Sequence, residues 1–342
     1  RGLQRGRRLR QTLAVPAVPG ADPAFVRGCF EAAAEAFPAA MDEFEGIVQG
    51  GEFDRQRLMA YYFARTESQL GGCTMFAVAP ACRSGGRGPI VGRNYDWATA
   101  DLHWCELQRF DTDGAPRRIG YTHHWAGCAD VLSAAGLYVA VASLPPVAVE
   151  APGVQWNIIV DMLSETCATV DEAVRACSRV RHLRPMSYLL ADSAGAVAVV
   201  EATPRQARRR GPEDGVVVAA NAPQGGLVAR DWSQQEPTTT LGEPILPEPP
   251  NYRTDALQRA HRRIQRALEL LHRAAPRLTL QDVRAVLSDH EAPICTGDHS
   301  EPDGGRWATI WSGICEPAAG SFSIVPGLPC RHPYQAFSIA GL

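Results

Sequence analysis

The chain has 342 residues, of which 45% are hydrophobic and 21% charged, and its formal net charge is −3. This balance gives no reason to expect nucleic acid or a membrane surface as a partner, and no apolar run approaches the length that spans a bilayer. All 34 residues counted as Lys or Arg are arginines. The absence of lysine excludes Schiff-base chemistry and a P-loop lysine.

The N-terminal part of the chain predicts an arm followed by helices. Residues 1–20 are basic and then briefly apolar, but Pro16 and Pro19 interrupt the apolar run, so we expect a disordered arm and not a signal peptide. Residues 21–72 have apolar side chains at helical spacing. We expect a break at Gly50-Gly51 and a new helix from about Asp54.

From residue 73 onward, short β-branched and aromatic runs between Gly, Pro and Asp turns predict strands. These runs cover 73–81, 89–97, 102–110, 117–125, 133–144, 186–204, 215–223, 307–317 and 320–327. Helices are expected at 156–166, 169–180, 253–274 and 279–289, the second of them with a Thr169–Glu172 capping box. Residues 224–251 predict a long loop. Two antiparallel sheets packed together, with helices outside, satisfy this order.

The ten cysteines include no CxxC pair, so we expect no zinc cluster, no other metal and no cofactor. Several of them, such as Cys167 and Cys177, lie in apolar runs and are typical of small buried residues. The simplest interpretation is a reduced, cytoplasmic protein. His123 and His124 are adjacent, would point to opposite faces of a strand, and lack an evident third ligand.

Two glycines stand directly before Cys73, at the entrance of the first predicted strand. Glycine adds no packing there, but it gives the backbone freedom. If the Gly72–Cys73 peptide bond is cut, Cys73 carries both a thiol and an α-amino group, whose reference pKa is about 7.7–8.0. One residue would then supply nucleophile and general base. We therefore predict cleavage before Cys73, made by Cys73 itself through a thioester.

Polar residues on neighbouring strands support this chemistry. Asp96 could hold the amine of Cys73, and Arg93 could stabilise its thiolate. Regular alternation places Arg93 and Asp96 on opposite faces, so a bulge or strand end is needed for both to reach Cys73. Asn221 ends an apolar strand, where its amide could donate to an oxyanion.

The segments "GCTMFAV", "IVGRNYDW", "GCADVLSAAGLYVAVAS", "AANAP", "NYRTDALQRA" and "RWATIWSGICEPAAGSFSIVPGLPC" resemble the N-terminal nucleophile (Ntn) hydrolases of the isopenicillin N acyltransferase and choloylglycine hydrolase group. The resemblance implies a four-layer αββα sandwich of two antiparallel sheets. It also implies a helical pro-segment over 21–72 and a catalytic domain over 73–342.

The resemblance assigns roles residue by residue. It implies that Cys73 is the nucleophile, Arg93 and Asp96 support it, and Asn221 binds the oxyanion. Ser143 stands where the family often has Asn and would add a backbone or side-chain donor to the oxyanion hole. Arg253 would be a polar residue near the site.

The function we infer is a self-processing cysteine amidohydrolase or acyltransferase acting on a small N-acyl, peptide-like or β-lactam-like metabolite. One alternative is an N-acyltransferase of natural-product biosynthesis that takes acyl-coenzyme A or an acyl carrier as partner, with the arginines of 205–210 as a docking loop. Another is an uncleaved, silent relative that binds a ligand or partner. The sequence leaves open the acyl group, homo-oligomer formation, and whether 1–72 stays bound after cleavage.

Overall fold

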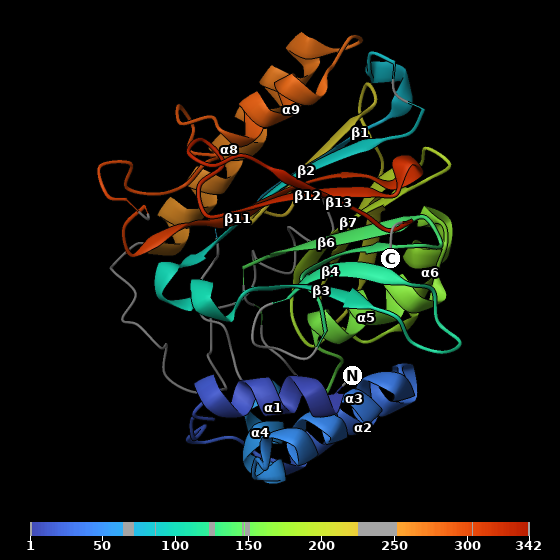
Figure 1. Cartoon of the computed structure of the whole chain (residues 1–342), viewed down its shortest axis with the longest axis vertical. Coiled ribbons are helices and arrows are strands. Elements are labelled where there is room, and N and C mark those ends of the chain that lie inside the picture. Colours follow the sequence, from blue (N-terminus) through green and yellow to red (C-terminus); the bar gives the residue numbers. More distant parts are fainter. Residues whose placement is uncertain are drawn as a thin grey trace.

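In the computed structural model, the described residues are 2–63, 72–85, 87–122, 127–145, 147, 151–224, 252–302 and 304–340. They form two antiparallel sheets packed face to face, with helices on both outer sides (Figure 1). This architecture confirms the predicted four-layer αββα sandwich. No helix among the described residues is long and apolar enough to cross a membrane.

The first sheet carries the segment that begins at Cys73. Its described strands run in the order β10-β1-β2-β11-β12-β13. Their bounds are β1 Thr74–Val78, β2 Ile90–Ala98, β10 Val216–Ala220, β11 Trp307–Glu316, β12 Ser321–Pro326 and β13 Gln335–Ser338. Helices α8 (Tyr252–Ala274) and α9 (Leu280–Leu287) cover its outer face and bury Phe76, Val218 and Ile264 between them and the strands. The amphipathic pattern of both helices is the reason for this packing.

The second sheet has the described strand order β3-β4-β5-β6-β7-β8-β9. Its strands are β3 Glu106–Phe110, β4 Arg118–Thr122, β5 Asp130–Ser133, β6 Leu137–Ser143, β7 Met186–Asp192, β8 Val197–Ala202 and β9 Ala207–Arg210. Helices α5 (Trp156–Thr166) and α6 (Val170–Arg179) cover its outer face. The Thr169–Glu172 capping box of α6 is present as predicted. The main core lies between the two sheets and under α5 and α6.

One expectation about the arginine-rich run 205–210 is wrong. The alternative function treated this run as a docking loop, but residues 207–210 form the edge strand β9, paired with β8. Two of its arginines already have acidic partners, since Arg209 pairs with Asp171 and Arg210 with Glu201. The strand forms because backbone pairing at a sheet edge tolerates charged side chains that point to water.

The prediction of a disordered arm over 1–20 is also wrong, because Gly2–Thr12 form helix α1. This helix packs along α3 (Pro38–Gly51), beside α2 (Pro23–Ala36) and α4 (Arg55–Phe63), in the helical layer at the bottom of Figure 1. Leu9 is buried, and the buried guanidinium of Arg5 pairs with Glu43 at 3.3 Å. Tertiary contact, and not local propensity, orders this basic segment.

The expected helix break directly follows the two glycines: α3 includes both and ends at Gly51, Glu52 caps it in the left-handed region at φ 50°, and α4 begins at Arg55, close to the predicted start near Asp54. Gly50 also has a packing role. A Cβ on Gly50 would lie 2.2 Å from the carbonyl oxygen of Leu3. Glycine is therefore needed here so that α1 and α3 can approach at backbone distance.

Candidate active site

Cys73 lies directly before β1, which is flanked by β10 and β2. Thr74 pairs with Ala220 on one side and with Asn94 on the other. Continuing both antiparallel registers by one residue places Cys73 between Asn221 and Tyr95. The side chain of Cys73 is buried, with 4% of the residue exposed. Cys73, at the predicted entrance of the strand, is therefore a buried position between Tyr95 of β2 and Asn221, which directly follows β10.

Arg93 lies on the face of the first sheet that meets the second sheet. It pairs with Met75, and Cys73 shares the face of Met75 because strand side chains alternate. Its Nε donates to Oδ2 of Asp130 on β5 at 2.7 Å, and its Nη1 donates to the carbonyl of Val141 at 2.6 Å. Its Nη2 has no hydrogen-bond partner among the residues that the structure describes. One donor group of this buried cation thus remains unpartnered within the described part of the chain.

Aromatic side chains surround this guanidinium. Its Cζ lies 4.9 Å from the ring centroid of Tyr95 and 5.8 Å from that of Trp311. The Tyr95 and Trp311 rings are stacked at 3.8 Å, and the indole Nε1 of Trp311 donates to Asp130 at 2.8 Å. These contacts fix the guanidinium and its carboxylate partner in one arrangement.

Burial and nearby charges shift the pKa of the Cys73 thiol in opposite directions. Burial raises the pKa of its thiol above the ordinary value, and Asp96 and Asp130 add to this rise. The positive charge of Arg93 lowers the pKa, as does a hydrogen bond from the backbone of Asp96. The net direction is upward. In the intact chain the thiol is therefore protonated near neutral pH, and it needs a base to react.

Asp96 lies on the opposite face of β2 from Arg93, as strand alternation predicted. Its Oδ1 accepts a hydrogen bond from Thr309 at 2.7 Å, and its Oδ2 has no hydrogen-bond partner within the described part of the chain. A Cβ added to Gly72 would lie 2.5 Å from this Oδ2. The carboxyl group thus lies against the backbone just before Cys73, and Gly72 is required by this close approach.

The buried position of Asp96 determines the pKa of its carboxyl group. Burial raises the pKa of its carboxyl to about 6, although the charge of Arg263 and hydrogen bonds from threonines act in the opposite direction. The bulge that we expected on the strand of Arg93 and Asp96 is not there: the register shift lies on the neighbouring strand β11, between Thr309 and Trp311, and the two side chains stay on opposite faces of β2. A carboxyl group with this pKa can exchange a proton near neutral pH.

Asn221 is held by three hydrogen bonds. Its Nδ2 donates to the carbonyl oxygen of Ser143 at 2.9 Å and to the Ser143 hydroxyl at 3.0 Å, and its Oδ1 accepts from Nη2 of Arg263 at 3.0 Å. In this arrangement Ser143 accepts from Asn221 through its carbonyl and its hydroxyl, and the proton of the hydroxyl remains available to donate. If Nδ2 of Asn221 donated to an oxyanion in place of the Ser143 hydroxyl, its hydrogen bond to the carbonyl oxygen of Ser143 could remain.

The sequence analysis missed Arg263. This residue of α8 is buried, and its Nε also donates to the hydroxyl of Thr74 at 3.1 Å, so that it joins β1 to Asn221. The amphipathic pattern of this helix predicts that its arginines face water, and Arg263 has no local feature that separates it from the others. Arg253, for which a role near the site was predicted, lies in the first turn of α8, and its side chain lies outside the described residues.

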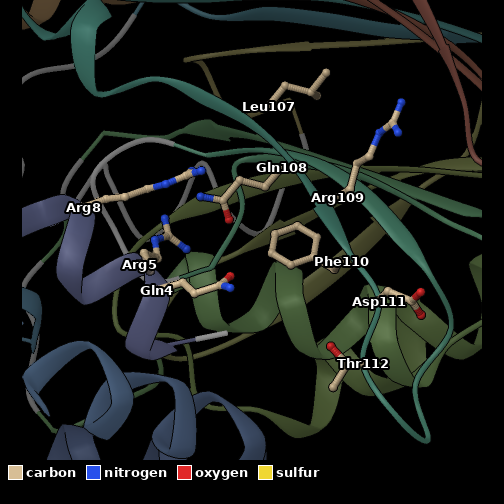
Figure 2. A pocket seen from close by; sticks show the side chains of 9 residues that line it. All are labelled: Gln4, Arg5, Arg8, Leu107, Gln108, Arg109, Phe110, Asp111 and Thr112. Carbon is tan, nitrogen blue, oxygen red and sulfur yellow. The ribbon is translucent and has the colours of Figure 1, made fainter. Parts of the chain in front are cut away.

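A cavity of about 440 Å³ lies between α1 and β3 (Figure 2). Its lining includes Arg5 and Arg8 of α1 and Arg109 and Phe110 of β3. Arg8 is paired with Glu106 at 3.4 Å across this junction. None of the residues around Cys73 lines this cavity. The adjacent His123 and His124, and all but the first residue of the predicted loop 224–251, lie outside the described residues.

A family model for acyl-coenzyme A:6-aminopenicillanic acid acyl-transferase matches residues 83–329. This is well over half of the chain. The chain belongs to this family. The match begins ten residues after Cys73, so it covers Arg93, Asp96 and Asn221 but not the predicted nucleophile.

Solved structures share the fold. A mutant conjugated bile acid hydrolase from Clostridium perfringens aligns with a TM-score of 0.52 and 11% identity, over 78% of this chain and 93% of that one. Penicillin V acylase from Agrobacterium tumefaciens aligns with a TM-score of 0.52 and 17% identity, over 78% and 85%. No curated protein matches the chain in sequence. At these identities the likeness establishes the Ntn-hydrolase-like fold alone.

Proposed function

We propose that the chain is a self-processing cysteine amidohydrolase or acyltransferase whose nucleophile is Cys73. The observation that carries this proposal is the grouping around one buried thiol: a buried arginine on its own face, a carboxyl group against the preceding glycine, and a side-chain amide on the flanking strand end. These residues are Arg93, Asp96 and Asn221. Each has the chemistry that acyl transfer through a thioester needs.

The first reaction is cleavage of the chain. The thiol sulfur of Cys73 attacks the carbonyl carbon of Gly72, and the thiol proton passes to the α-nitrogen of Cys73 as the C–N bond breaks. Gly72 is then held as a thioester. Water attacks this thioester, which releases the carboxylate of Gly72 and restores the thiol. Asp96 is the group beside this peptide bond, and at its raised pKa it can carry the proton.

The second reaction uses the new α-amino group as the base. It takes the proton of the thiol, and the thiolate, stabilised by Arg93, attacks the carbonyl carbon of an N-acyl substrate. Asn221 donates to the oxyanion, the leaving amine takes the proton, and an acyl-enzyme forms. Water or an amine acceptor then releases the acyl group. The substrate class is a small N-acyl compound, peptide-like or β-lactam-like.

Intact mass under denaturing conditions tests the proposal. We compare wild type, Cys73→Ala and the control Cys82→Ala, whose half-buried thiol lies after β1 and away from the site. Fragments of residues 1–72 and 73–342 in wild type and in Cys82→Ala, but not in Cys73→Ala, support the proposal. An uncut chain in all three removes the amine base and favours a silent, ligand-binding relative.

Dependence on an acyl-coenzyme A donor is the second candidate, and the family description favours it. The two functions differ in what limits turnover. Hydrolysis of an N-acyl substrate proceeds in water alone. Transfer requires an amine acceptor, and its rate rises with the concentrations of acyl-coenzyme A and acceptor. A carrier-linked acyl donor can be compared in the same assay.

A further inference from the structure

Two cysteines and two histidines from separate parts of the sequence meet at one place. Three lie in the segment after α9, and the fourth lies in the turn that follows β12. Their potential ligand atoms all lie within 4.8 Å of one another. These residues are His290, Cys295, His299 and Cys330.

We propose that these four side chains bind one Zn²⁺ ion in a tetrahedral Cys₂His₂ site. Thiolate and imidazole are the ligands that structural zinc prefers, and four such ligands close the coordination sphere. This proposal departs from the expectation of no metal site, which rested on the absence of a CxxC pair. It concerns a different place from Cys73 and does not depend on the proposed function.

The sulfur atoms have the spacing that a shared ion requires. The Sγ atoms of Cys295 and Cys330 are 3.7 Å apart. Two sulfurs bound tetrahedrally at about 2.3 Å from one zinc ion would be about 3.8 Å apart. A disulfide needs a sulfur–sulfur distance near about 2.05 Å. The observed separation therefore matches two ligands of one ion and not a bonded pair.

The ring of His299 is oriented as a ligand. Its Nε2 donates to the carbonyl oxygen of Cys295 at 3.2 Å, which requires the proton to be on Nε2. The other nitrogen, Nδ1, then presents a lone pair and lies 4.0 Å from Sγ of Cys330. Metal-binding histidines typically donate their second nitrogen to a carbonyl or carboxylate in this manner.

The protein also holds the segments in place. Arg331 follows Cys330, and its guanidinium donates to the carbonyl oxygens of Glu301 and Pro302 at 2.6 and 2.7 Å, and to that of His299. The backbone N–H of Cys295 donates to the carbonyl of Asp289 at 3.0 Å. The ligands are thus pre-positioned by contacts that do not involve a metal.

Metal content of the full chain tests the site. The chain is purified without chelators, dialysed against metal-free buffer, and its zinc is measured by mass spectrometry. Wild type and Cys82→Ser should each hold one equivalent. Cys330→Ser and His299→Gln should lose most of it, with zinc affinity reduced by more than about 100-fold, because even outer-shell changes weaken metal sites by about 10–100-fold.

Cobalt substitution gives a second readout in chains that remain folded. Cys330 is exposed, so Cys330→Ser should fold, and circular dichroism checks this. Wild type loaded with Co²⁺ should show intense tetrahedral visible bands and sulfur charge-transfer absorption, and Cys330→Ser should weaken both. The proposal is overturned if purified wild type contains no zinc and, after loading with Co²⁺, shows only the weak absorption bands of octahedral cobalt. A Cys295–Cys330 disulfide in freshly purified protein, or zinc retained in both ligand variants, would overturn it too.

Discussion

The ion pair between Arg93 and Asp130 connects the two sheets directly. Arg93 belongs to β2 and Asp130 to β5, both side chains are fully buried, and their closest hydrogen bond is 2.7 Å long. Removing either partner leaves an uncompensated buried charge, which typically destabilises a protein by about 3–5 kcal/mol. We therefore expect both Arg93→Met and Asp130→Asn to lower the free energy of unfolding by about this amount, with Asn at the lower end because it keeps an acceptor for Trp311.

The same two substitutions should have opposite effects on the thiol of Cys73. Arg93 lowers the pKa of this thiol, and Asp130 raises it. Arg93→Met removes the positive charge, so the pKa of Cys73 should rise. Asp130→Asn removes a negative charge while keeping Arg93, so the pKa should fall. Loss of stability alone cannot produce shifts of opposite sign.

The assay has two parts. Urea unfolding gives the free energy of unfolding, and alkylation by iodoacetamide as a function of pH gives the pKa of the Cys73 thiol. Peptide mass mapping identifies Cys73 as the alkylated residue, and only chains that are all cleaved or all uncleaved before Cys73 are compared. Arg118→Met is the matched control, because Arg118 is also a buried arginine with acidic partners, Asp161 and Glu165, beneath α5. It should lose stability without moving the Cys73 profile. Shifts of the same sign in Arg93→Met and Asp130→Asn would refute the electrostatic argument.

Three further outcomes follow from the site and its surroundings. Burial raises the pKa of Asp96 from 3.8 to about 6, so protonation of Asp96 contributes its full amount to the free energy of unfolding below about pH 4, and this contribution is lost as the pH rises through 6. Urea unfolding of wild type should therefore show a lower free energy of unfolding at pH 7 than at pH 4, and Asp96→Asn should reduce this difference by on the order of 3 kcal/mol. Asn221→Ala should reduce the rate of acyl transfer by about 10²–10³ in single-turnover kinetics with little change in fold by circular dichroism, as expected for an oxyanion donor; an unchanged rate would exclude that role. Gly50→Ala should detach α1, read as faster tryptic cleavage at its arginines, whereas Gly211→Ala, which meets nothing within 4 Å, should not.

Strand alternation is the part of the site that the sequence could predict. The side chains of Arg93 and Asp96 lie on opposite faces of β2, as a period of two requires. Asn221 lies at the end of β10 because an apolar run ends there. Such features are local, because the sequence of one strand determines them independently of the neighbouring strands.

Features that depend on pairing between distant segments were missed. Arg263 lies on an amphipathic helix among other arginines, and only the contact of α8 with β1 and β10 makes it a buried donor. Helix α1 packs closely against glycines of α3. In the sequence alone, these glycines look like a helix-breaking signal and not like a contact between helices. Cys330 is 35 residues from Cys295, beyond the spacing of recognisable zinc motifs.

The proposed zinc site and Asp96 are connected through one short segment. Cys295 precedes Thr296, whose backbone N–H donates to the hydroxyl of Thr309 at 3.0 Å, and that hydroxyl donates to Asp96 at 2.7 Å. A metal that fixes Cys295 therefore also fixes the carboxyl group beside Gly72. Removing zinc should therefore slow cleavage before Cys73 in a time course by intact mass. An unchanged rate of cleavage in the zinc-free chain would mean that Asp96 keeps its position without the ion, and the connection through Thr296 and Thr309 would then be wrong.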